Sequence, residues 1–295
     1  MKNQNSISRR FALKSSVFGL LAVSIPSVVF AKNMVSIDQK PIIKEGLSHG
    51  YPAIDDDIVA QVVGASHSNL EKIKTMVSAR PELSRATWDW GFGDWETAIG
   101  AASHVGRRDI AQFLMEHGAR PDIFTYAMLG ALPAVKSMIE AQPGVQTIAG
   151  PHGISLLQHV KNGLRFDGLT QKQKNDNQAL IDYLESLGNA DIQVENMALS
   201  ALEKERYLGD YKYGDGPEDG FSIKLNMRDN LSFGKLGNFG GMLYRTGVDE
   251  FIYNAMPTVK IVFNKESNKV TGLTIHEPDF TLTAKKMDES LGSKQ

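Results

Sequence analysis

One pattern of apolar residues recurs four times between about residues 53 and 191. In each copy the apolar side chains follow an i, i+3, i+4 spacing, which places them on one face of a helix. A single pair of helices cannot bury such a stripe by itself, so the sequence predicts helical pairs that stack into a solenoid. The four stripes are Ile73, Met76, Val77; Ile110, Phe113, Leu114; Val135, Met138, Ile139; and Leu180, Tyr183, Leu184.

Helix-ending and helix-starting residues flank these stripes. Gly118 and Gly188 each come four residues after the last stripe residue, where a helix commonly ends in a left-handed conformation. Asp55, Asp56 and Asp57 are expected at the N-terminus of the first helix, where carboxylates are favourable. Ser68 and Glu71 have the spacing of a capping box for the second helix, and Pro81 is expected to end it.

The second copy of the pattern resembles an ankyrin repeat. The residues that carry the resemblance are 97–102, Gly106, 109–114 and 116–119, which match a Thr-Pro-Leu-His helix start, a Gly turn, an Ile-Val-x-x-Leu-Leu helix and a final Gly-Ala. Ala98 replaces the usual Pro and Gly100 the usual His. The copies are unequally spaced, and the fourth carries a polar insertion at about 165–177. The resemblance implies about four degenerate ankyrin-like units over residues 53–200, an architecture that mostly binds proteins.

The apolar period changes from 3.6 to 2 at about Tyr207. This alternation is typical of strands with one buried face, and turn residues separate the runs. Six to eight short antiparallel strands between residues 205 and 287 predict a small β-barrel or half-barrel. The clearest alternating runs are Phe221, Ile223, Leu225; Val259, Ile261, Phe263; and Leu273, Ile275. The expected fold class is therefore α+β in two domains.

Residues 207–211, 243–251 and 270–276 resemble the small lipocalin-like C-terminal domain of class C β-lactamase-like serine hydrolases. That family has a His-Gln pair where this chain has His276 and Glu277. The resemblance implies a fold and one alternative function, that of an accessory subunit of a periplasmic hydrolase. A second alternative is that the β-domain is a small-ligand carrier. In the second case a cavity would be lined by Phe221, Phe233, Tyr244, Phe251 and Phe263.

Residues 1–31 are expected to be an export signal. A basic start is followed by an apolar run that is too short and too interrupted to span a membrane. Residues 8–14 resemble a twin-arginine signal, although Ala12 replaces the usual Phe. An ordinary secretory signal and an uncleaved anchor are the alternatives. We expect a periplasmic protein with a leader segment at 32–52 and a flexible tail at 288–295.

Composition excludes several classes of function. The chain has no cysteine, which excludes disulfides, thiol catalysis and thiolate metal sites. It has 32 Lys and Arg against 34 Asp and Glu, and loss of the four basic residues in the signal leaves a mature chain near −6. This acidic balance predicts no nucleic-acid partner. We also expect no membrane association after cleavage, and a monomer.

The seven histidines show no recognisable metal-ligand spacing. His67 and His104 occupy similar places at the ends of first helices, which the repeat pattern explains, and His152 and His159 are seven residues apart. A single local group, His276 with Glu277 and Asp279, is a weak signal. The Ser-x-x-Lys pattern from Ser232 falls in a predicted strand. The sequence thus predicts no metal site, no cofactor, no catalytic residue and no enzymatic activity.

The three tryptophans lie close together, in the segment that an ankyrin register makes the finger loop between the first two units. Exposed aromatic residues on such a loop are typical contact residues, whereas the alternative is that they pack between units. We predict a non-enzymatic protein-interaction module that uses its concave face and finger loops. The predicted contact residues are Trp88, Trp90, Phe92, Trp95, His104 and Tyr126.

Overall fold

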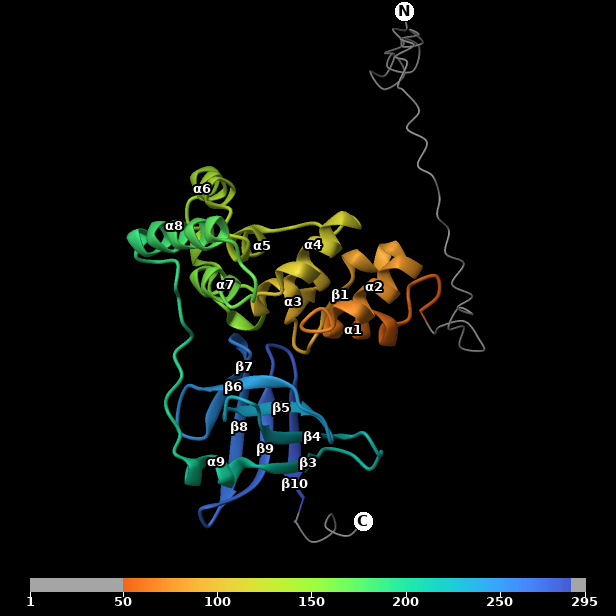
Figure 1. Cartoon of the computed structure of the whole chain (residues 1–295). Coiled ribbons are helices and arrows are strands. Elements are labelled where there is room, and N and C mark those ends of the chain that lie inside the picture. The colour runs from red at the N-terminus through yellow and green to blue at the C-terminus, as the bar shows by residue number, and fades with distance from the viewer. Residues whose placement is uncertain (1–49, 288–295) are drawn as a thin grey trace, which may run out of the picture. The chain divides into compact units, whose positions relative to one another are not determined.

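The computed structural model describes residues 50–287 (Figure 1). The predicted signal (1–31), most of the predicted leader (32–52) and the predicted tail (288–295) lie outside the described residues. Within the described range, none of the helices has the length and apolar character needed to cross a membrane.

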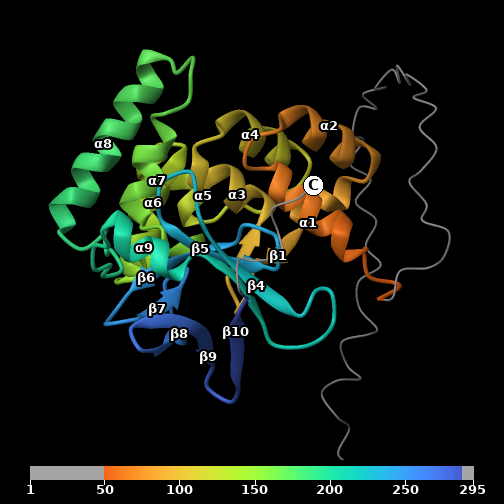
Figure 2. The ribbon, with the colours of Figure 1, turned by 90° about the horizontal axis from the view of Figure 1, so that it is seen from below.

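The first part of the described chain consists of four helical pairs that follow one another (Figures 1 and 2). The first helices of the pairs pack in sequence, α1 on α3, α3 on α5 and α5 on α7, and among the second helices α2 packs on α4 and α6 on α8. The pairs are α1 (Asp56–Ala65) and α2 (Leu70–Ala79), α3 (Ala98–Val105) and α4 (Arg108–Glu116), α5 (Ile123–Met128) and α6 (Leu132–Ala141), and α7 (Leu156–Gly163) and α8 (Gln171–Leu187). Short 3₁₀ turns lie at η2 (Pro81–Arg85), η3 (Val145–Thr147) and η4 (Pro151–Gly153).

The four apolar stripes lie on α2, α4, α6 and α8, as predicted. Two residues of each stripe are buried: Ile73 and Val77, Ile110 and Leu114, Val135 and Ile139, and Leu180 and Leu184. The remaining residue of each stripe is partly buried against the same clusters. The helical part has two apolar clusters, one formed mainly by α1 to α4 and one by α5 to α8.

Most predicted helix ends are confirmed. Asp55 caps α1 by accepting a hydrogen bond from the Asp57 N–H. Gly118 and Gly188 have φ of 91° and 71°, in the left-handed region. The predicted capping box at Ser68 is wrong, because the side chain of Asn69 caps α2 by accepting from the Lys72 N–H.

The predicted polar insertion at 165–177 is only partly a loop. Its second half forms the beginning of α8, where Thr170 and Gln173 make a reciprocal capping box. Polar residues there are compatible with a helix because this end of α8 is largely exposed.

The predicted finger loop between the first two pairs is a β-hairpin. Its strands β1 (Thr87–Asp89) and β2 (Trp95–Thr97) pair antiparallel, with Trp88 opposite Glu96. The connecting loop has positive φ at Gly91, Phe92 and Gly93.

The second part of the described chain is a closed antiparallel β-barrel, so the half-barrel alternative is wrong. It begins with α9 (Ala201–Tyr207), and the strands around the barrel follow the order β10-β3-β4-β5-β6-β7-β8-β9. The strands are β3 (Gly209–Lys212), β4 (Gly220–Leu225), β5 (Leu231–Lys235), β6 (Gly241–Arg245), β7 (Glu250–Tyr253), β8 (Met256–Glu266), β9 (Lys269–His276) and β10 (Thr281–Lys286).

The barrel interior is filled by its own side chains. Phe233, Phe251 and Phe263 belong to one buried cluster, and the rings of Phe251 and Phe263 are 5.4 Å apart. The alternating residues on β4, β8 and β9 contribute to the same cluster, which confirms the predicted period of 2. The fold class is α+β with an eight-stranded closed barrel.

Candidate metal centre

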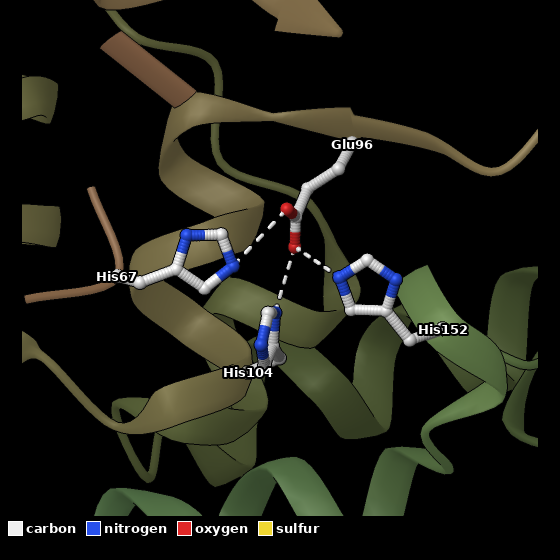
Figure 3. A group of neighbouring side chains, drawn as sticks. All are labelled: His67, Glu96, His104 and His152. Atoms are coloured by element: carbon white, nitrogen blue, oxygen red, sulfur yellow. Dashed lines mark hydrogen bonds and ion pairs between the residues drawn. The ribbon is translucent and has the colours of Figure 1, made fainter. Parts of the chain in front are cut away.

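Three histidines converge on one glutamate in the helical part of the chain (Figure 3). His67 follows the end of α1, Glu96 lies in β2, His104 lies in the last turn of α3, and His152 lies in η4. One ligand atom from each of these four side chains lies within 4.8 Å of the others. We call these four residues the His₃Glu cluster.

Local structure explains how each side chain reaches the cluster. Glu96 is the middle residue of a short strand, and its side chain is buried. Thr97 ends that strand and caps α3, so that His104 lies two helical turns further along. His152 has a φ of 59°, in the left-handed region, which turns η4 toward the hairpin.

Glu96 is the common partner of all three imidazoles. The Nδ1 of His104 is 2.7 Å from Glu96 Oε1, and the Nε2 of His152 is 3.5 Å from the same oxygen. The Nε2 of His67 is 3.4 Å from Glu96 Oε2. The indole Nε1 of Trp90 donates to Oε2 at 2.8 Å.

The outer nitrogens of two histidines are held by hydrogen-bond acceptors. His67 Nδ1 lies 3.0 Å from the carbonyl oxygen of Gly64, and His152 Nδ1 lies 2.6 Å from Asp94 Oδ2. Because a carbonyl and a carboxylate only accept, both Nδ1 atoms carry the proton. In the neutral rings, Nε2 is then an unprotonated acceptor directed at the Glu96 carboxylate. Such histidine–acceptor pairs are typical of metal-ligating histidines.

Two buried carboxylates lie at the site, Glu96 in the cluster and Asp94 beside His152, and each is 1% exposed. Burial would raise the pKa of Glu96, but the hydrogen bonds and charges of His104 and His152 hold it well below its usual range. Burial would lower the pKa of His152, but Asp94 and Glu96 raise it to about 9. Burial lowers the pKa of His104 despite Glu96. Proton binding by His152 therefore compensates only one of two buried negative charges.

Two of the four side chains in the cluster are partly exposed to solvent. The side chains of His67 and His152 are 26% and 23% exposed, whereas those of Glu96 and His104 are buried. The ring of Trp90 lies near both of these histidines, with its centroid 6.0 Å from that of His67 and 6.4 Å from that of His152.

The predicted contact residues have different environments. Trp95 is 63% exposed, and it is the only one of the six that is largely open to solvent. The others make contacts inside the chain: Trp88 and Trp90 pack on the first helical cluster, Phe92 packs on the barrel cluster, Tyr126 packs on the second helical cluster, and His104 belongs to the His₃Glu cluster.

The other histidines and the serine considered as candidates lie outside the His₃Glu cluster. His159 is buried in α7, its Nδ1 bonded to the carbonyl of Ser155. His276 is exposed at the end of β9. Ser232 lies within β5, as predicted, and its hydroxyl donates to the Lys224 carbonyl.

Spacing along the chain could not identify the His₃Glu cluster, because its members are far apart in the sequence and come from four separate elements. One usable signal was present. His67 and His104 have equivalent places in consecutive helical pairs, and stacking of the pairs brings equivalent places together; their rings are 4.9 Å apart.

No protein-family model matches the chain, and no curated protein matches it in sequence.

Proposed function

We propose that the His₃Glu cluster binds a divalent first-row transition metal ion, with Zn²⁺ as the best-matched ion. The observation that carries this proposal is the pair of inner nitrogens, His67 Nε2 and His152 Nε2, that are directed at the buried Glu96 carboxylate while their outer nitrogens are held by acceptors. A metal cation between these atoms takes the place of the proton on His152 Nε2 and uses both Nε2 atoms and the carboxylate as ligands. The proposal replaces the expectation from sequence spacing that the chain has no metal site.

Charge balance supports a divalent cation. The two buried carboxylates, Asp94 and Glu96, carry two negative charges in a place where unpaired charge is costly. One dication neutralises both, with Glu96 as a direct ligand and Asp94 acting through His152.

The donor set defines the class of metal. Three imidazole nitrogens and one carboxylate oxygen suit Zn²⁺, Co²⁺, Ni²⁺, Mn²⁺ or Fe²⁺. Ca²⁺ and Mg²⁺ prefer sites made of oxygen ligands, and Cu⁺ prefers sulfur.

Two of the distances are close to those around a four-coordinate ion, and the four ligand atoms lie within 4.8 Å of one another. Ligand atoms about 2.0 to 2.1 Å from a tetrahedral Zn²⁺ are about 3.3 to 3.4 Å from one another. His67 Nε2 is 3.4 Å from Glu96 Oε2, and His152 Nε2 is 3.5 Å from the other oxygen, Oε1. The distance from Glu96 to His104, 2.7 Å, is that of a hydrogen bond and must lengthen when the ion displaces the shared proton.

Four protein ligands are the usual pattern of a structural zinc site. The ion would join the end of α1, the β1–β2 hairpin, α3 and η4, which span the first two helical pairs and the segment before α7. We therefore infer that the metal stabilises a binding module which has no disulfide to hold it together.

The test is metal binding by the purified chain after chelator treatment. We expect one Zn²⁺ or Co²⁺ per chain by calorimetry. Loss of a residue that only hydrogen-bonds a ligating histidine costs about 10- to 100-fold in metal affinity. Because Glu96 is itself a ligand, Glu96→Gln should cost at least about 100-fold. His276→Ala, which removes an exposed histidine outside the cluster, is the matched control and should bind like the wild type.

A stability measurement provides a second readout. Zn²⁺ at 100 times its dissociation constant should add about 2.7 kcal/mol to the free energy of unfolding. Equal binding by the wild type and Glu96→Gln, or no stoichiometric binding by the folded wild type, would contradict the proposal.

A second candidate function is protein binding, which the exposure of Trp95 favours. This side chain lies on the β1–β2 hairpin and lines a shallow pocket of about 300 Å³ with Asp122, Phe124 and Met256. A large exposed aromatic residue beside a pocket is a typical contact point. We infer that the four helical pairs are degenerate ankyrin-type units and that the hairpin acts as their finger loop.

This second function is tested by capture of partners from a periplasmic extract. The wild type should retain a protein that Trp95→Ala loses, while Tyr213→Ala, which removes an exposed aromatic residue of the barrel part, should retain it. Equal recovery by both variants would contradict a role for Trp95.

A further inference from the structure

The barrel reaches the His₃Glu cluster through the turn between β7 and β8. In this turn, Asn254 Nδ2 donates to Asp94 Oδ2 at 2.6 Å. The neighbouring Tyr253 hydroxyl donates to the carbonyl of Trp90 at 2.9 Å. Tyr253 and Asn254 thus both bond to the loop of the β1–β2 hairpin, although about 160 residues separate them from it in the sequence.

The amide of Asn254 has a fixed orientation. The side-chain Oδ1 of Asn254 accepts from the backbone N–H of Met242 at 2.7 Å. The backbone N–H of Asn254 donates to the Met242 carbonyl at 2.8 Å. Since a backbone N–H can only donate, the oxygen of the amide faces Met242 and the NH₂ group faces Asp94. The residue is 4% exposed, with a φ of 42°.

Asp94 links this amide to the histidine. Its Oδ1 accepts from the backbone N–H of His152 at 3.0 Å, and its Oδ2 accepts from His152 Nδ1 at 2.6 Å. The carboxylate therefore fixes the ring of His152 as well as the backbone that carries it. The Nδ2 of Asn254 donates to the same oxygen, Asp94 Oδ2, that accepts from His152 Nδ1.

The hairpin is also anchored in the barrel by packing. Phe92, in the loop of the hairpin, packs on the barrel cluster, with its ring centroid 5.0 Å from that of Tyr253. The loop that contains Asp94 is thus held by the barrel on one side and by His152 on the other.

We propose that Asn254 of the barrel is a positioning residue of the metal centre, which acts through Asp94 to hold His152 Nε2 in the orientation that binds the ion. This inference rests on the proposed metal-binding function. Outer hydrogen-bond partners of a ligating histidine fix its tautomer and ring orientation, and their loss typically lowers metal affinity by about 10- to 100-fold. The barrel therefore contributes a positioning residue to a metal centre whose ligands all lie in the helical part.

The experiment is a double-mutant cycle on Co²⁺ affinity with the purified full chain. Asn254→Gly removes the amide but suits the positive φ, so the turn can keep its shape. It should lower the affinity by about 10-fold or more. Ala255→Gly makes the same kind of backbone change one residue further, at a φ of 64°, without touching Asp94, and should bind like the wild type.

The second arm tests whether Asn254 acts through the histidine. His152→Ala removes the ligand, and Asn254→Gly added to His152→Ala should cause no further loss of affinity. The visible spectrum of the bound Co²⁺ should also differ between the wild type and Asn254→Gly, because the coordination of His152 changes.

The possible outcomes separate the two proposals. If the wild type binds no metal, the proposed function is wrong. If the wild type binds metal and Glu96→Gln does not, but Asn254→Gly binds like the wild type, only the role of Asn254 is wrong. An equal loss on adding Asn254→Gly to the wild type and to His152→Ala would show a general structural effect and would also overturn the inference.

Discussion

We expect the metal-free chain to lose stability between pH 6.5 and pH 9 because of His152. Asp94 and Glu96 raise the pKa of this histidine from 6.5 to about 9 despite its burial. A histidine with a raised pKa in the folded state stabilises the fold fully below its unfolded-state pKa. That contribution is lost as the pH rises through the folded-state pKa.

The magnitude follows from the two pKa values. Each pKa unit is worth about 1.36 kcal/mol, so the difference between 6.5 and about 9 corresponds to a loss of about 3 kcal/mol. The steepest slope is that of one proton, about 1.36 kcal/mol per pH unit. Burial lowers the pKa values of His104 and His159, so their effects on stability fall below pH 6.5.

The assay is urea unfolding of the chelated chain at a series of pH values, followed by tryptophan fluorescence. The three tryptophans all lie in the β1–β2 hairpin segment, so the signal reports unfolding next to His152. Asp94→Asn removes the first of the two carboxylates and should reduce the loss by about half or more, because only Glu96 then raises the pKa of His152. His276→Ala should leave the loss unchanged.

A free energy of unfolding that stays constant from pH 6.5 to pH 9 in the metal-free chain would refute this reasoning. A loss that is the same in the wild type and in Asp94→Asn would assign the titration to another group. With Zn²⁺ bound, the loss should disappear, because the metal replaces the proton on the inner nitrogen.

Three further predictions concern stability. Gly106→Ala should lower the free energy of unfolding by more than about 2 kcal/mol, because Gly106 has a φ of 83° and an added Cβ would lie 2.2 Å from the carbonyl oxygen of Asn162. Gly118→Ala, with nothing within 4 Å of the added Cβ, should lower it by about 1 kcal/mol from backbone strain alone. Equal losses for the two variants in urea unfolding would contradict this. Phe251→Ala should lower the free energy of unfolding by about 3 to 5 kcal/mol, because removal of the fully buried ring leaves a cavity in the barrel. A decrease below about 1 kcal/mol, measured by denaturant unfolding with circular dichroism, would be inconsistent with the filled interior. Thr170→Ala should lower stability by about 1 kcal/mol through loss of the α8 capping box, and an unchanged thermal midpoint would show that the cap contributes nothing.

The helical part could be predicted well because its signals are local. An i, i+3, i+4 stripe is a property of a few neighbouring residues, and it defined α2, α4, α6 and α8 before any tertiary contact was known. The barrel strands were predicted for the same reason, from the alternation in β4, β8 and β9. Closure of the barrel was not determined by the alternation, because it depends on the pairing of β10 with β3 at opposite ends of the domain.

The predicted contact residues show where the local argument fails. The sequence does not distinguish Trp88, Trp90 and Trp95, because they are neighbours in one aromatic segment. In the hairpin, Trp90 Nε1 donates to Glu96 while Trp95 is 63% exposed. The difference depends on what packs against each side chain: Trp88 and Trp90 pack on the apolar cluster of the first two helical pairs.

The sequence by itself determined the elements of this protein: helical pairs, a strand-rich second part and a chain without thiol chemistry. Each follows from composition or from periodicity over one or two turns, where the interactions are between near neighbours. Only the tertiary structure decided that His67, Glu96, His104 and His152 meet, and that Asn254 approaches them from the barrel. Ligand geometry requires atoms within a few ångströms in space, and residues from separate elements satisfy it only when packing brings those elements together.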